Sequence, residues 1–161
     1  MRTLKKRRKE HKTDYGNRLK LLISRKPRLV FRRTNRYFIA QYTTSKEAQD
    51  KVDCGTTSKE LLKYGWPENA KGSLKSISAA YFTGLLIGKK ILDKKLKTPI
   101  VDLGMIRTLH KTKVYGFLKG LIDSGVKINC KEEAFPEDAR IKGACLKNKI
   151  PFEEIIEKIR K

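Results

Sequence analysis

The sequence predicts an α/β domain whose mixed sheet is covered by helices, preceded by an extended basic N-terminal arm. Three observations carry this prediction. Basic residues are concentrated in the first thirty-six positions. Two runs rich in β-branched and aromatic residues, 28–33 and 37–43, indicate neighbouring strands. Farther along the chain, segments with apolar residues at helical spacing alternate with short apolar strands. The 161 residues, 39% of them hydrophobic, suffice for one core of ordinary size. We therefore expect an arm over residues 1–12 and a single domain over residues 13–161.

The positive charge lies mainly at one end of the chain. Between Arg2 and Arg36 there are fifteen Lys and Arg residues against only Glu10 and Asp14, whereas the whole chain has a formal net charge of +22. Nine of the twelve arginines lie in this stretch, and guanidinium groups match phosphate oxygens in pairs. Self-repulsion should keep the arm extended until it binds an anion. The distribution indicates a nucleic acid as the partner.

Composition also excludes several classes of protein. No stretch approaches the ~20 apolar residues of a membrane-spanning helix, and no apolar signal region follows the N-terminal charges. We expect a cytoplasmic protein without membrane attachment. The three cysteines, Cys54, Cys130 and Cys145, lack C-x-x-C spacing. They predict buried free thiols rather than a zinc site or disulfides.

The N-terminal half of the domain predicts a helix and an antiparallel meander. Thr13 or Asp14 can cap a helix that Pro27 ends. Two runs rich in β-branched and aromatic residues, 28–33 and 37–43, flank a polar turn and predict a hairpin, and residues 51–56 predict a weaker third strand. A capping box from Thr57 to Glu60 then predicts a short helix over residues 58–64.

The C-terminal half predicts a crossover between parallel strands. Apolar spacing indicates a long helix over residues 73–95, in which Gly84 and Gly88 suggest close approach to the sheet. A strand over 99–103, a helix from Val114 to Gly125 and a strand over 126–130 would then form a parallel βαβ unit. A short helix should begin at Pro136, and a last one should run over about 151–160.

The sequence contains no arrangement typical of catalysis. It lacks a phosphate-binding loop, a dinucleotide fingerprint, a nucleophile elbow and a zinc-protease motif. His11 beside Asp14, and His110 in a basic loop, have no catalytic partners in the pattern. We therefore expect no enzyme, no cofactor, no metal and no small-molecule substrate.

Two alternatives remain open from the residues alone. Asp53, Asp102 and Asp123 are the one plausible carboxylate trio. If Asp53 and Asp102 approached one another across the sheet, the chain would be a metal-dependent RNA nuclease on an RNase-H-like sheet. A membrane-surface or DNA-architectural protein is a further alternative, although no recognition-helix or zinc-finger signature favours duplex DNA.

The features that favour RNA converge in the N-terminal segment. An extended cationic arm, a helix with Arg18 on its polar side, and a hairpin with basic ends would provide phosphate contacts. Tyr37 and Tyr42 could stack on bases, although packing in the sheet or core is the simpler explanation for each tyrosine. Arms of this kind commonly become ordered on folded RNA.

Several motifs resemble one protein family along nearly the whole chain. They are Arg7-Arg-Lys-Glu-His-Lys-Thr-Asp-Tyr15, Lys26-Pro-Arg-Leu-Val30, Tyr64-Gly-Trp66, Ala80-Tyr-Phe-Thr-Gly-Leu-Leu86, Val101-Asp-Leu-Gly104, Lys113-Val-Tyr-Gly-Phe-Leu-Lys-Gly-Leu-Ile-Asp123 and Arg140-Ile-Lys-Gly143. In this order they resemble the universal 5S-rRNA-binding protein family of the large ribosomal subunit, numbered eighteen in bacteria and archaea. The absence of the longer eukaryotic C-terminal region makes an archaeal-type member the better fit.

The resemblance implies a non-enzymatic α/β protein of the central protuberance, where it would tether 5S rRNA to large-subunit rRNA beside neighbouring ribosomal proteins. It also implies which parts face RNA: the arm, the first helix and the segment from Arg25 to Arg36. Together with the charge pattern, it predicts RNA contacts from Arg2, Lys5, Lys6, Arg7, Arg8, Lys9, His11, Lys12, Tyr15, Arg18, Lys20, Arg25, Lys26, Arg28, Arg32, Arg33, Asn35 and Arg36. The loop from Arg107 to Lys111 departs from the family's Gly- and Pro-rich pattern, so we assign no RNA contact to it.

Overall fold

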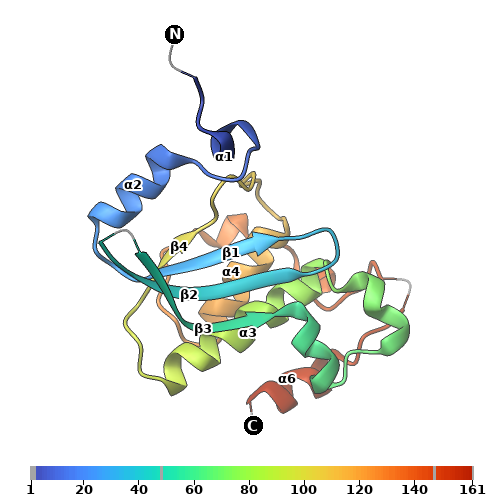
Figure 1. Cartoon of the computed structure of the whole chain (residues 1–161). Helices are drawn as coiled ribbons and strands as arrows, with labels where there is room; N and C mark the ends of the chain where they lie inside the picture. Colours follow the sequence, from blue (N-terminus) through green and yellow to red (C-terminus); the bar gives the residue numbers. More distant parts are fainter. Residues whose placement is uncertain (1–2, 48, 147, 161) are drawn as a thin grey trace.

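Strand β1 (Arg28–Arg33) forms because its residues alternate between two faces, with Leu29 and Phe31 fully buried on one of them. In the computed structural model, which describes residues 3–47, 49–146 and 148–160, β1 lies inside a four-stranded sheet. Its neighbours are β2 (Phe38–Lys46), β3 (Gln49–Thr57) and β4 (Ile100–Asp102), and the strand order is β3-β2-β1-β4 (Figure 1). The predicted mixed sheet with its antiparallel meander is confirmed.

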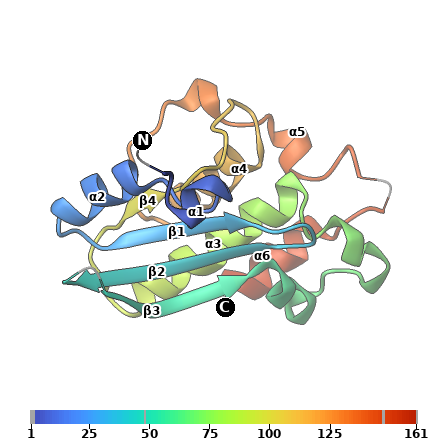
Figure 2. The same cartoon turned by 45° about the horizontal axis from the view of Figure 1, so that its top comes forward.

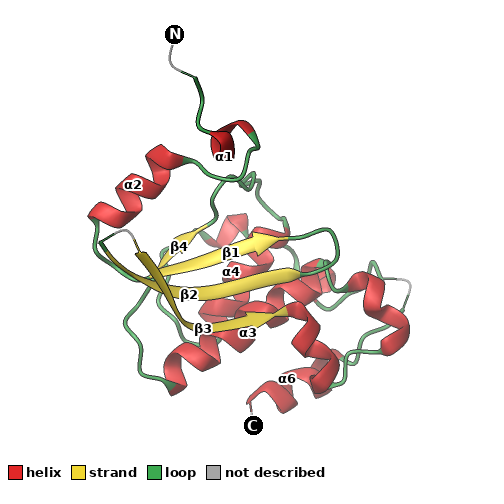
Figure 3. Ribbon diagram, in the orientation of Figure 1, coloured by secondary structure: helices red, strands yellow, loops and turns green. Residues whose placement is uncertain are grey.

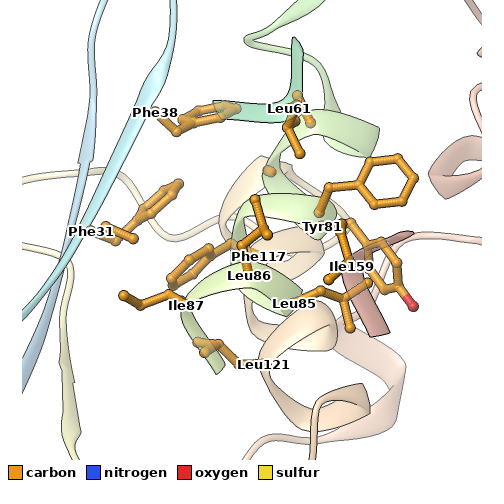
Figure 4. Close-up of a cluster of buried hydrophobic side chains, with 14 of the residues drawn as sticks. Phe31, Phe38, Leu61, Tyr81, Leu85, Leu86, Ile87, Phe117, Leu121 and Ile159 are labelled. Atoms are coloured by element: carbon orange, nitrogen blue, oxygen red, sulfur yellow. The ribbon is translucent and has the colours of Figure 1, made fainter. Parts of the chain in front are cut away.

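Two long helices cover one face of the sheet. Helix α3 (Ile77–Asp93) and helix α4 (Lys113–Asp123) lie side by side behind the strands in Figures 1 and 3. The ring of Phe31 stacks on Phe117 of α4 with centroids 4.2 Å apart and on Phe38 of β2 at 5.3 Å. Figure 4 shows these rings meeting the leucine and isoleucine side chains of α3. Burial of this apolar surface joins the sheet to the helices.

Glycines bring α3 and α4 into backbone contact. A Cβ atom on Gly84 would lie 2.2 Å from the carbonyl oxygen of Phe117, and one on Gly120 would lie 2.1 Å from that of Tyr81. We predicted that Gly84 and Gly88 serve an approach to the sheet. The structure corrects this, because their neighbours belong to α4 and to Ser124 just after it.

The parallel pair of strands differs from the predicted one. Strand β4 pairs in parallel with β1, with Leu29 opposite Val101, whereas residues 126–130 form no strand. Val126 is buried and Ile128 packs against the core. The alternation that suggested a strand therefore reflects side-chain burial, which a segment without ladder hydrogen bonds also provides. The connection between the paired strands runs through β2, β3 and α3, so 99–103 and 126–130 do not form a βαβ unit.

The shorter elements are α1 (Lys6–Lys9), α2 (Tyr15–Ile23), the 3-10 helices η1 (Ser58–Tyr64), η2 (Glu68–Ser73) and η3 (Glu132–Ala134), and the helices α5 (Asp138–Ile141) and α6 (Phe152–Arg160). Of these, α2, η1, α5 and α6 lie where the sequence pattern placed a helix, whereas α1, η2 and η3 were not predicted. The Asp14 carboxylate accepts from the N–H groups of Gly16 and Asn17 and so caps α2, and the predicted capping box of Thr57 and Glu60 opens η1.

Three local expectations need correction. The arm, expected to be extended, contains one helical turn at α1. The long helix begins at Ile77 rather than Ser73, because Ser76 accepts a hydrogen bond from the Ala79 N–H and caps it there. Of the three free cysteines only Cys54 is buried, while Cys130 is half-buried and Cys145 is exposed.

Replacing Gly84 by alanine should destabilise the protein, because the added methyl group would meet helix backbone that cannot rotate away. We expect the free energy of unfolding, measured by urea denaturation, to fall by about 1–3 kcal/mol or more. Gly72→Ala is the matched control, since a Cβ there meets no atom within 4 Å. It should stay within ~0.5 kcal/mol of wild type. Equal stability of the two variants would contradict close α3–α4 packing.

Candidate nucleic-acid interface

Asp102, the last residue of β4, holds three groups in place. Its Oδ2 atom accepts a 3.0 Å hydrogen bond from Nη1 of Arg28 and lies 3.7 Å from Nη2 of Arg32. Its Oδ1 atom accepts from the N–H of Gly104 at 2.8 Å. The Asp102 side chain is 7% exposed, so these interactions act with little screening by water.

Arg28 has a structural role instead of the predicted RNA contact. It is 1% exposed, and besides Asp102 it donates to Asp50 Oδ1 at 2.6 Å and to the Ser45 hydroxyl at 3.1 Å. A buried guanidinium needs such partners, because an unpaired charge inside the protein is costly. Arg28 therefore joins β1 to β4 and to the β2–β3 hairpin, and its guanidinium is not exposed on the surface.

Arg32 lies on the same face of β1 as Arg28, nearer the end of the strand. Its Nη1 atom donates to the carbonyl oxygens of Phe31 and Asp102, and its side chain is 42% exposed. Gly104 turns the chain beside it with a φ of 60°, and a Cβ there would lie 2.9 Å from Arg32 Nη1. Glycine therefore lets the loop after β4 pass directly over this guanidinium.

The arm lies beside the same loop. Arg8 approaches the sulfur of Met105 at 3.9 Å and the Asp14 carboxylate at 3.4 Å, while Arg7 Nε donates to the Thr13 hydroxyl at 3.0 Å. In Figures 1 and 2, α1 lies next to the loop that follows β4. Segments distant in sequence are thus assembled around the end of β1.

Together these segments form what we call the cationic hollow, a surface depression of about 570 Å³. The side chains around it come from the arm, from β1 and from the loop after β4: Arg7, His11, Lys12, Arg32, Arg33, Leu103, Met105, Ile106 and Arg107. Five of them are cationic, and none of the described residues lining it is an acid. Positive groups converging in a concave surface raise the local concentration of polyanions.

The other predicted contact residues lie outside the hollow, and most of them are exposed. Arg2 lies outside the described residues. The exposed side chains are Lys5, Lys6, Lys9, Lys20, Arg25, Lys26, Asn35 and Arg36. Arg8 and Arg18 are half-buried, and Arg18 pairs with Asp50 at 3.0 Å. These residues extend the basic surface along α1, α2 and the β1–β2 turn.

The tyrosines divide between surface and core. Tyr15 is half-buried with the Lys5 ammonium 4.7 Å from its ring centroid, and Tyr37 has Lys59 at 4.4 Å. Tyr42 is 2% exposed and donates its hydroxyl to the Lys97 carbonyl. Packing is therefore the role of Tyr42, and it is not available for stacking on a base.

Sequence reasoning missed Arg107. The sequence shows that its loop is basic. The predicted pairing of the preceding strand, 99–103, with residues 126–130 would not place this loop beside β1, however. Parallel pairing of β4 with β1 places the loop there, because parallel strands have their carboxyl ends at the same end of the sheet. Arg107 lines the hollow with Arg33 and has no ion pair among the described residues.

The structure separates the carboxylates considered for a nuclease. Asp53 and Asp102 lie in β3 and β4, at opposite edges of the sheet. Asp53 accepts from Thr44, and Asp123 accepts from the Tyr81 hydroxyl on the helical side. No group of three potential metal ligands occurs within 3–47, 49–146 and 148–160. The same ranges contain no helix with the length and apolar character needed to span a bilayer.

Comparison with known proteins gives consistent relatives. Residues 1–99 match the family described as "Ribosomal large subunit proteins 60S L5, and 50S L18". Over 138 residues the chain is 42% identical to large ribosomal subunit protein uL18 of Korarchaeum cryptofilum and 41% identical to that of Methanosphaera stadtmanae, in both cases covering 86% of this chain and 69% of the relative. It is 40% identical to that of Thermofilum pendens over 143 residues, 89% of this chain and 71% of the relative.

Asp50 should make the stability of the protein depend on pH. Burial alone would raise the pKa of its carboxyl, but hydrogen bonds from Ser45, Arg28 and Arg18 outweigh burial and lower the pKa. A carboxyl whose pKa is lower in the folded state contributes stability above its unfolded pKa, about 3.9 for Asp, and loses it as the pH falls through the folded value. In urea denaturation from about pH 7 to about pH 3, Asp50→Asn should lose less stability than wild type.

Asp93→Asn is the control for this experiment. The Asp93 side chain is exposed at the end of α3 and makes no ion pair among the described residues. This variant should keep the acid sensitivity of wild type. If Asp50→Asn also kept it in full, the pKa of Asp50 would not be lowered in the folded protein.

Proposed function

This chain belongs to the large-subunit ribosomal protein family of 60S L5 and 50S L18, and we propose that it binds 5S rRNA and attaches it to large-subunit rRNA in the central protuberance. Its relatives are structural proteins of the ribosome and not enzymes. The proposal places the chain in the cytoplasmic large subunit, in contact with neighbouring ribosomal proteins.

One observation carries the proposal: cations from three separate segments converge on the cationic hollow without a lining carboxylate. Arg33 and Arg107 are exposed and have no ion pair among the described residues. Charges that no carboxylate of the chain neutralises are available for phosphates. Each phosphate neutralised releases condensed counterions, which favours binding.

The hollow recognises the shape of RNA more than its sequence. Folded RNA displays phosphates at spacings set by its A-form helices and loops, and a rigid protein surface reads these spacings. Asp102 fixes the Arg32 guanidinium, and the core holds β1, so little side-chain freedom is lost when RNA binds. Guanidinium groups then pair with phosphate oxygens through two parallel hydrogen bonds.

A tether must hold two RNAs at once. The hollow presents one cluster of cations, and the exposed basic side chains of α2 and its exit, Lys20, Arg25 and Lys26, lie outside it. Two separate basic surfaces allow 5S rRNA and large-subunit rRNA to bind the same chain simultaneously. Leu19 and Ile23 on α2 are largely exposed and would be covered in an assembled particle.

Removing residues 1–12 should weaken binding and flatten its dependence on salt, while the core stays folded. The deletion removes Arg7 and Lys12 from the hollow but none of the described core residues. Affinity for in vitro transcribed Methanosphaera stadtmanae 5S rRNA should be measured by filter binding over a salt series. Circular dichroism checks the fold. Unchanged affinity in a folded protein would count against the proposal.

A double substitution, Arg33→Gln with Arg107→Gln, tests the hollow itself. Loss of two phosphate contacts should lower the affinity for 5S rRNA at least about tenfold, since a hydrogen bond to a charged group contributes ~1.5–3 kcal/mol. The slope of log affinity against log salt should fall by about 2.

The matched control is Lys131→Gln with Arg160→Gln, which removes the same charge from exposed positions outside the hollow. It should leave the affinity within about threefold of wild type, because neither side chain lines the hollow and salt screens exposed charges that make no direct phosphate contact. If both double variants bind 5S rRNA equally, binding depends on net charge alone and the assigned hollow is wrong.

A further inference from the structure

A second depression adjoins the cationic hollow and differs from it in chemistry. Its volume is about 390 Å³, within the roughly 300–1,000 Å³ of pockets that hold small ligands. We call it the lined pocket, since it has an apolar floor and a basic rim. It shares Arg33, Ile106 and Arg107 with the cationic hollow. An RNA backbone bound in the hollow would therefore run past the opening of the lined pocket.

The floor is built from the core itself. The half-buried Ile77 and Ile106 provide its accessible surface, and the stacked rings of Phe31 and Phe38 lie buried beneath them. Leu109 lies at the opening of the pocket, and 56% of its surface is exposed. A leucine this exposed above an apolar floor leaves hydrophobic surface in water, and covering it with a flat apolar group would be favourable.

The rim carries uncompensated positive charge. It consists of five basic residues: Arg33, Arg107, Lys111, Lys113 and Arg140. Among the described residues only Lys111 has a carboxylate partner, Glu137 at 3.8 Å. Burial, then repulsion from Arg33 and Lys75, lowers the pKa of Lys113. A bound anion would relieve this repulsion.

The start of α4 strengthens the same field. Thr112 and Lys113, the cap and first residue of the helix, line the pocket. The cap makes no side-chain hydrogen bond to the helix, and the first turn contains no acid. The free N–H groups of the first turn therefore add partial positive charge to the rim.

We propose that the lined pocket holds one unpaired nucleotide of the bound RNA, with its base against Leu109 and the apolar floor and its phosphates on Arg33 and Lys113. The inference rests on the proposed function and names a contact within it. A nucleotide joins a flat base to an anionic group, and so matches floor and rim together. An acidic peptide matches the rim but has no flat apolar group for the floor.

A pair of oligonucleotides tests the proposal on the full chain. Pentauridylate is compared with a ribose-phosphate strand of the same length that lacks all five bases, so the two carry equal charge. The bases should increase affinity roughly tenfold, since a stacked base contributes ~1–3 kcal/mol. Leu109→Ala should remove most of that difference and leave binding of the abasic oligonucleotide unchanged. Lys113→Gln should weaken both.

Leu92→Ala is the matched control, because Leu92 is 48% exposed on α3 and lies outside the lined pocket. It should leave both affinities within about twofold of wild type. Equal binding of the two oligonucleotides, binding of neither, or insensitivity to Leu109→Ala overturns the base pocket. Stronger competition by pentaglutamate, lost in Leu109→Ala, overturns it in favour of an acidic peptide.

The affinity of the same proteins for 5S rRNA is also measured, which separates the proposed nucleotide pocket from the proposed function. If 5S rRNA binds tightly while the oligonucleotides show no preference for a base, the lined pocket fails and the function stands. If 5S rRNA does not bind at all, the proposed function itself fails.

Discussion

The contact between Asp102 and Arg28 holds the functional surface together. Strand β4 is three residues long and pairs only with β1 among the described strands, so ladder hydrogen bonds alone would hold it weakly. The buried ion pair between the two strands holds β4 against β1, since moving either partner away would leave a charge uncompensated in the interior. Its geometry therefore determines where the chain leaves the sheet after β4.

The consequences of this contact reach the residues that line the cationic hollow. The other oxygen of Asp102 accepts from Gly104 and directs the following loop, which brings Arg107 beside Arg33. Asp102 also approaches Arg32. One buried carboxylate thus orients cations from two elements. Repulsion between like charges opposes such a cluster, and the rigid sheet and the close packing of α3 on α4 hold it together.

Much of the fold could be predicted from local pattern. The hairpin of β1 and β2, the capping box at Thr57, and helices α3 and α4 follow from spacings within a few residues, because side-chain periodicity reports which face is buried. The partner of a strand depends on contacts far away in sequence. Residues 126–130 show the limit, since Val126 and Ile128 are buried in a segment that forms no strand.

By itself the sequence determined where the positive charge is, that the chain carries no catalytic motif, and which family it resembles, since these depend on residue identity and order alone. Only the tertiary structure decided which cations face outward. Arg28 and Arg32 share one face of β1, yet Arg28 is enclosed by carboxylates while Arg32 borders the hollow. The difference arises mainly from Asp50, which pairs with Arg28 and not with Arg32 and whose position is set by the pairing of β2 with β3.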